Sequence, residues 1–152
     1  MISEIREQKS EARKRITMQI KSAKELIVYA KAYELAMEIF NLSKAFPQEE
    51  KYALTSQIRR SSRSVSMNLR EVWSKRRYEA HFISKLTDCD GETNETDTSL
   101  DFAKDCGYIT EILHKALTEL NREVGRMLGS MISNPEPFLI KPSKSLPLTS
   151  DL

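Results

Sequence analysis

The scarcity of residues that interrupt helices constrains the fold more than any other feature of the sequence. Pro47 is the only proline before Pro135, and the whole chain of 152 residues contains four glycines. Because proline and glycine most disfavour helix interiors, this span favours long helices over many short strands. The chain has the length of one domain, and 39% hydrophobic with 30% charged residues is typical of a charge-rich helical protein.

Four segments carry apolar residues at intervals of three or four positions, the pattern of amphipathic helices. The first predicted helix extends from about Ser3 to Leu42, and its stripe comprises Leu26, Tyr29, Tyr33, Ala36, Met37 and Phe40. The part before this stripe has few large apolar residues, so we expect it to extend the helix into solvent or toward a partner. Pro47 suits the first position of a second helix, whose dipole Glu49 and Glu50 would complement.

The other three predicted helices follow from their own stripes and end signals. The second has its stripe from Leu54 to Val72 and should end between Trp73 and Arg77. The third has an alternating spacing of four and three, with a polar middle: Phe82, Leu86, Cys89, Thr93, Thr96, Leu100 and Ala103. Gly107 is the expected left-handed stop of this helix, and Thr110 the N-cap of the fourth.

These helices predict an all-α protein, an up-down-up-down antiparallel four-helix bundle with an extended N-terminal helix. We expect a helical N-terminal extension over residues 1–24, the bundle over 25–133 and a flexible tail rich in proline and serine over 134–152. The N-terminus lacks a signal-like apolar region, and no run of about 18 apolar residues suggests a membrane span. A cytoplasmic protein without a membrane partner is therefore expected.

Several short motifs, spaced along much of the chain, resemble a known family. They are Phe46-Pro47, Tyr52-x-Leu54-x-x-Gln57-x-Arg59-Arg60, Ser64, Asn68 and Gly107-Tyr108-Ile109. Together they resemble a bacterial four-helix-bundle family that includes proteins encoded within intervening sequences of large-subunit ribosomal RNA genes. The resemblance covers about residues 25–132. It implies a cytoplasmic homo-oligomer, with a pentamer as the expected assembly, and one branch of the family assists retroelement reverse transcriptases and contacts nucleic acid through a basic surface.

Two segments depart from the family pattern. The family's Ala-Glu-Gly turn after the asparagine is replaced here by Leu69-Arg70-Glu71, so we expect the second helix to run longer. The family's apolar segment in the third helix is replaced by the acidic "TDCDGETNETDT".

The second and third predicted helices carry blocks of opposite charge. One block has seven basic residues against Glu71 alone: Arg59, Arg60, Arg63, Arg70, Lys75, Arg76 and Arg77. The other, from Asp88 to Asp105, has seven acids against Lys104. In an antiparallel hairpin these blocks lie side by side, and arginine suits bidentate pairing with carboxylates.

We expect carboxylates within the bundle or across a subunit interface to engage at least two of Arg59, Arg60 and Arg63, with Glu92, Glu95 and Asp97 as candidate ion-pair partners. The seven basic residues are also the candidate nucleic-acid-binding residues, and those nearest the turn, Arg70, Arg76 and Arg77, should be the most available. Binding would be directed to the phosphate backbone of RNA or single-stranded DNA, depend steeply on salt and show little sequence preference.

Other site chemistries find little support in the sequence. An EF-hand over residues 88–99 would need glycine at its sixth position and glutamate at its twelfth, where Thr93 and Ser99 stand. Glu111 and His114 form one Glu-x-x-His, whereas a di-iron bundle needs two. No phosphate-binding glycine loop or nucleophile elbow occurs, so we expect no enzyme and no cofactor.

Three smaller features have structural interpretations. Cys89 and Cys106 are expected to be packed thiols, and Gly125 with Gly129 suggests a tight helix contact within or between subunits.

The leading hypothesis is a non-enzymatic, homo-oligomeric, weak nucleic-acid-binding protein. The alternative is a scaffold that binds a protein partner through the N-terminal helix or the tail, with the arginines purely structural.

Overall fold

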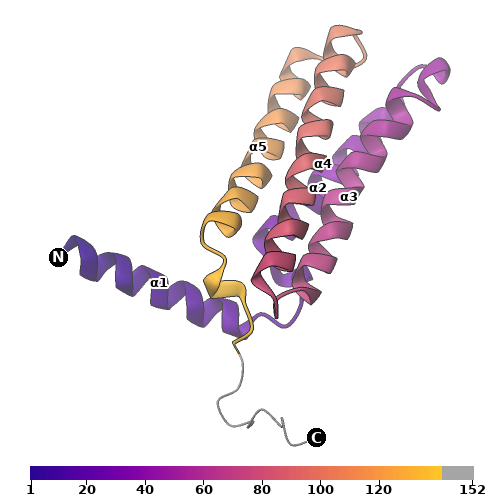
Figure 1. Cartoon of the computed structure of the whole chain (residues 1–152). Coiled ribbons are helices and arrows are strands. Elements are labelled where there is room, and N and C mark those ends of the chain that lie inside the picture. The colour runs from indigo at the N-terminus through magenta and orange to yellow at the C-terminus, as the bar shows by residue number, and fades with distance from the viewer. Residues whose placement is uncertain (142–152) are drawn as a thin grey trace, which may run out of the picture.

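A computed structural model describes residues 1–141 of the chain, with the backbone alone for residues 13–19. The described residues contain five α-helices, three short 3-10 helices and no strand. The α-helices are α1 (Ile2–Gln19), α2 (Ile27–Ser43), α3 (Leu54–Ser74), α4 (Glu79–Asp105) and α5 (Glu111–Ser133). Helices α2 to α5 pack in a closed order, each beside the next and α5 beside α2, which confirms the predicted antiparallel four-helix bundle (Figure 1).

The first predicted helix is two helices, not one. The chain leaves the helical conformation after Gln19 and passes through the 3-10 helix η1 (Ala23–Glu25) before α2 begins. Ala23 and Leu26 in this link pack at the end of the bundle core, where they are only 1% and 5% exposed. The charged segment before them has no comparable apolar stripe, so α1 leaves the bundle at an angle to the other helices (Figure 1).

The stripe predicted for the first helix is only partly buried. The buried face of α2 comprises Val28, Ala32, Leu35, Ala36, Ile39 and Ser43. Tyr33 and Met37, which the spacing placed in the core, are exposed, and Tyr29 and Phe40 are half-buried. Because α2 has more apolar residues than its buried face can hold, these four form a second apolar edge of the helix, and Phe40 on this edge packs against Arg59 and Arg63 of α3.

The ends of the helices follow local chemistry. Pro47 precedes a short 3-10 helix, η2 (Gln48–Glu50), and α3 begins only at Leu54, so the predicted start at Pro47 was too early. The end of α3 at Ser74 lies in the predicted interval. Gly107 adopts φ of 78°, and the Oγ1 of Thr110 accepts a hydrogen bond from the N–H of Leu113, which confirms both predicted signals between α4 and α5.

The bundle core consists of two apolar clusters separated by a polar belt. One cluster lies near the α3–α4 turn and includes Leu69, Phe82 and Leu128, whereas the other lies near the α4–α5 turn and includes Ile58 and Leu100. The belt between them is formed by the buried side chains of Ser61, Ser62, Thr93, Thr96 and Asn121. The polar middle predicted for the third helix therefore faces the core.

Hydrogen bonds satisfy much of this belt. The Thr96 hydroxyl donates to the Oγ of Ser61 at 2.9 Å, and the amide of Asn121 donates to the Thr93 carbonyl at 2.9 Å. The Ser62 hydroxyl donates to the carbonyl of Ile58 at 2.7 Å. Buried polar groups are tolerated where such partners exist.

The segment after α5 packs against the bundle before the description ends. Phe138 and Leu139, in and after η3 (Glu136–Phe138), contact the cluster near the α3–α4 turn. The N–H of Ile140 donates to the carbonyl of Arg76 at 3.0 Å. The predicted flexible tail thus packs over its first residues, and its part beyond Lys141 lies outside the described residues. No described helix is long and apolar enough to cross a membrane.

Candidate nucleic-acid interface

The basic residues of α3 divide between two neighbouring helices. Arg59 and Arg63 are four positions apart and lie on the edge of α3 that faces α2, whereas Arg60 is turned by about 100° toward α4. The Nε of Arg59 donates to the Oγ of Ser43 at 2.7 Å. The guanidinium groups of Arg59 and Arg63 lie 4.9 and 5.3 Å from the centroid of the Phe40 ring. Both arginines are therefore held by an aromatic ring of α2.

Arg60 is the arginine of this group that carboxylates engage. Its Nη1 lies 3.4 Å from the Glu92 carboxylate, and its Nη2 donates to the Glu95 carboxylate. The hydrogen bond to Glu95 is the main cause that raises the pKa of Arg60 above its ordinary value. Because the Arg60 side chain is 54% exposed, the pairs contribute at most about 1 kcal/mol to stability.

Within the described chain, carboxylates engage only Arg60 of the three arginines, and pairing of Arg59 or Arg63 across a subunit interface stays a prediction. The acidic block of α4 faces only the edge of α3 that carries Arg60, and Phe40 occupies the opposite edge. Asp97, proposed as an ion-pair partner, forms no ion pair with a described residue, and its Oδ1 is buried without a hydrogen bond. It lies on the edge of α4 that faces α5, not α3.

Three basic residues near the end of α3 are free of such contacts. Arg70, Lys75 and Arg77 are exposed, and none forms an ion pair with a carboxylate in the described part of the chain. Arg76 differs, although its sequence position suggested an available residue. Its guanidinium lies 3.6 Å from the centroid of the Trp73 ring, its Nε donates to the Trp73 carbonyl at 2.8 Å, and burial lowers its pKa.

The structure adds neighbours that sequence reasoning did not assign to this surface. Tyr33 and Met37 of α2 are exposed beside Phe40, and Met67 of α3 is exposed among the arginines. Lys85 of α4 forms an ion pair with Glu71 at 2.7 Å. The charge of the one acidic residue in the basic block is therefore paired with a lysine outside that block. The aromatic edge of α2 could have been inferred from its apolar residues, which outnumber the positions of one helical stripe.

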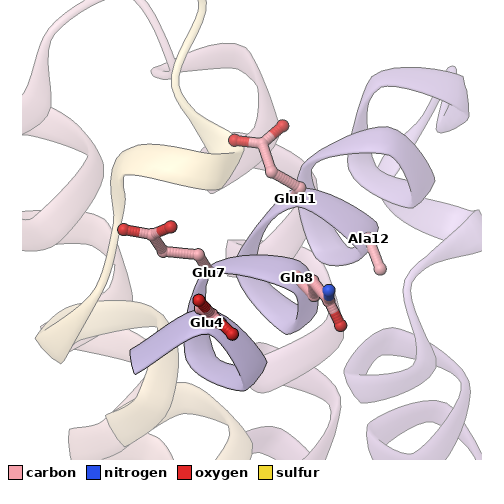
Figure 2. Close-up of a pocket in the computed structure, with 5 residues that line it drawn as sticks. All are labelled: Glu4, Glu7, Gln8, Glu11 and Ala12. Atoms are coloured by element: carbon pink, nitrogen blue, oxygen red, sulfur yellow. The ribbon is translucent and has the colours of Figure 1, made fainter. Parts of the chain in front are cut away.

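A second charged surface lies on α1. Figure 2 shows Glu4, Glu7 and Glu11 on one side of this helix, around a hollow that Gln8 and Ala12 also line. Their spacing of three and four positions places them on one face. Within residues 1–141, no group of three or more histidine, cysteine or acidic side chains is arranged to hold a metal ion. The acidic segment 88–99, considered above for calcium, is helical throughout.

The two cysteines differ. Cys89 is fully buried, and burial raises the pKa of its thiol to about 12. Cys106 is exposed at the end of α4, so the prediction of a packed thiol holds for Cys89 and was wrong for Cys106. Gly125 and Gly129 likewise make no close contact within the chain, since a Cβ added to either would meet no atom within 4 Å.

The fold and this surface define a class: an all-helical protein with an antiparallel four-helix bundle whose third helix displays arginines beside an aromatic edge. The family described as 23S rRNA-intervening sequence protein matches residues 24–130. The chain belongs to this family, as the motifs in the sequence indicated.

A solved structure agrees with this assignment. A protein of unknown function from the S23 ribosomal protein family of Bacteroides thetaiotaomicron VPI-5482 is 32% identical and superposes with a TM-score of 0.65. The comparison covers 71% of this chain and 96% of that one. A comparison with curated proteins found no match.

Proposed function

We propose that the protein is a non-enzymatic, weak nucleic-acid-binding protein that contacts the phosphate backbone of RNA or single-stranded DNA along α3. The observation that carries this proposal is that Arg70, Lys75 and Arg77 are exposed and form no ion pair with a carboxylate of the described residues. Arg63 extends the same stripe, because its only described contact is the face of Phe40. Such cations release counterions when they neutralise phosphates.

The apolar edge of α2 supports a single-stranded ligand over a duplex. Tyr33 is exposed next to the half-buried Tyr29, and their ring centroids lie 6.2 Å apart. Exposed aromatic rings beside a basic stripe provide stacking surfaces for unpaired bases, and such stacking tolerates any base. The expected binding is therefore weak, dependent on salt and poor in sequence preference.

A ring of subunits would strengthen this binding. The family resemblance implies a homo-oligomer, with a pentamer as the expected assembly, and symmetry would repeat the stripe around it. Repetition concentrates the positive field and adds avidity without any new contact.

The test is a titration of labelled single-stranded RNA by fluorescence anisotropy at about 50 mM salt. A triple variant, Arg63→Gln, Arg70→Gln and Arg77→Gln, should weaken binding by about tenfold or more and lower the salt slope by about 2. The matched control, Lys9→Gln, Lys24→Gln and Lys115→Gln, removes the same charge from exposed positions outside α3. A flat titration, or equal weakening by the control, would contradict the proposal.

A second candidate function has its own supporting observation. Helix α1 leaves the bundle (Figure 1). Ile2 and Ile5 on this helix are 74% and 49% exposed. Exposed apolar residues on a helix that projects from the fold offer a contact surface to a protein partner. Under this alternative the arginines are structural, and Ile2→Ser with Ile5→Ser would abolish partner binding while the α3 triple variant would not.

A further inference from the structure

The outward side of α3 is a helix face that the described chain leaves uncovered. Arg63, Met67 and Arg70 are exposed and lie within about 60° of one another around the helix, and we call them the outer face of α3. Arg63 and Arg70 are seven residues apart, or about 10.5 Å along the helix axis. Met67, between them, is 68% exposed. This face fits a surface that brings carboxylates at the same interval and covers Met67.

Helix α1 has most of its own surface available for such a contact. It lies outside the residues 24–130 that match the family, so the family assigns it no role. It packs against η3, whose three residues are too few to cover a helix of 18. Packing against other parts of a structure supplies most of the stability of a helix of about this length. A further contact would therefore stabilise α1.

The outer half of α1 carries carboxylates at the interval of the two arginines. Glu4, Glu7 and Glu11 are exposed and lie within about 60° of one another on one side of the helix (Figure 2). Glu4 and Glu11 are seven residues apart, which again corresponds to about 10.5 Å. Arg6 and Lys9 lie about 130° or more from the centre of this acidic face. The acidic face of α1 and the outer face of α3 are thus complementary in charge and in spacing.

The acidic face does not lie on the α3 of its own chain. Ile20, directly after α1, packs against the bundle core, and so do Ala23 and Leu26. These contacts fix the base of α1, and from this base the helix extends away from the four-helix bundle (Figure 1). A second copy of the chain is free of this restriction. It also supplies both halves of the contact, because each copy carries one acidic face and one outer face of α3.

We propose that the acidic face of α1 docks on the outer face of α3 of a second copy of this chain. The carboxylates of Glu4 and Glu11 then lie against the guanidinium groups of Arg63 and Arg70, and α1 covers Met67. Ion pairs at an exposed surface are individually weak, so one such contact is weak as well. Because every copy offers both faces, an assembly of copies repeats the contact and gains avidity.

The contact would also regulate the surface assigned above to nucleic acid, and this part rests on the proposed function. Arg63 and Arg70 belong to the stripe that would neutralise phosphates. Carboxylates seated on the same two arginines occupy the positions that phosphates would take. Helix α1 of one copy therefore competes with a single strand for α3 of the next copy.

A charge-reversal experiment on the full chain tests the docking. Glu4→Arg with Glu7→Arg reverses α1, and Arg63→Glu with Arg70→Glu reverses α3. By light scattering at about 50 mM salt, each variant alone should have a lower mass than the wild type, because like charges then face each other. An equal mixture of the two should recover the wild-type mass, since each α1 again meets an α3 of opposite charge.

A matched control separates this contact from a general effect of charge. Glu38→Arg with Glu119→Arg makes the same change at exposed positions of α2 and α5 and should keep the wild-type mass. Should a reversed variant fail to show cooperative thermal unfolding, Glu4→Gln with Glu7→Gln replaces it, and the mass should still fall. A wild type with the mass of one chain, a reversed variant that keeps the wild-type mass, or a mixture of folded variants that does not recover it would each overturn the proposal.

A second measurement tests the competition and keeps the two proposals distinguishable. Glu4→Gln with Glu7→Gln should bind single-stranded RNA about threefold or more tightly than the wild type, because α1 no longer competes for the arginines. Equal affinity would contradict the competition. If no variant binds RNA, the proposed function fails, whereas the mass measurements contain no nucleic acid and still decide whether α1 docks on α3.

Discussion

The side chain of Phe40 limits the conformational freedom of the two arginines that pack on its ring. The sequence placed it in a core stripe, and the structure places it half-buried under the guanidinium groups of Arg59 and Arg63. Each such contact at a partly exposed site contributes about 0.5–1 kcal/mol. Arg59 is held more firmly than Arg63, because Arg59 also donates a hydrogen bond to Ser43, whereas Arg63 has no further described contact.

At the same scale, the two thiols should differ in reactivity. Cys106 should react with a disulfide reagent at pH 8 in the native protein, because its thiol is exposed. Cys89 should react only after unfolding, because it is buried and its pKa is raised to about 12, so almost no thiolate forms. Absorbance should report one thiol in buffer and two in denaturant. Two fast thiols in buffer would show that the core around Cys89 opens readily.

At the scale of elements, α3 and α4 are joined by polar contacts along one side. Lys85 bonds to Glu71 at 2.7 Å near the turn, and Arg60 contacts Glu92 and Glu95 farther from it. Both sets lie at the surface with partly exposed side chains, so they add little to a hairpin whose stability comes mainly from the buried faces of the two helices. Salt should weaken them.

The pair of Glu71 and Lys85 predicts a dependence on pH. Its hydrogen bond lowers the pKa of Glu71 in the folded state. The stabilisation is then present above the unfolded value of about 4.3 and is lost as the pH falls through the lower folded value. In urea unfolding, Glu71→Gln should be less stable than the wild type at pH 7, and the difference should close toward pH 3. A difference that stays constant across this range would contradict the pairing.

Much of these elements could be predicted from the sequence, and the missing part has a physical reason. The seam of α4, the stop at Gly107 and the cap at Thr110 are local patterns, and the structure shows each of them. Local patterns give the face of a helix but not its neighbour. The partners of Arg59 and Arg60 depend on which helix flanks each edge of α3, and periodicity does not encode that. The break before α2 was missed for a similar reason, since burial of Ala23 and Leu26 depends on the rest of the bundle.

At the scale of the whole molecule, the bundle leaves apolar surface that one chain does not cover. Tyr33, Met37 and Met67 are 54%, 44% and 68% exposed on α2 and α3. Exposed apolar residues that gather on one side mark interaction surfaces more often than isolated ones do. This surface can serve a second copy or a nucleic acid, and the two uses compete for the same residues.

Light scattering should find a mass above the 17.5 kDa of one chain at micromolar concentration. If subunits meet through the α2 edge, Tyr33→Gln with Met37→Gln should shift the mass toward that of a monomer. If the wild type has the mass of one chain, no ring of subunits forms and the basic stripe is not repeated by symmetry. An unchanged mass in the double variant would show that the subunits meet through a different surface.

The polar belt across the middle of the core also has a consequence for how the helices find their axial register. The hydrogen bonds from Thr96 to Ser61 and from Asn121 to Thr93 form at only one offset of α4 against its neighbours. A slip of one helical turn would bring these polar groups against the apolar clusters on either side and leave them without partners. A core of leucine alone would tolerate that slip far better. The belt thus selects one alignment among several that hydrophobic burial would accept.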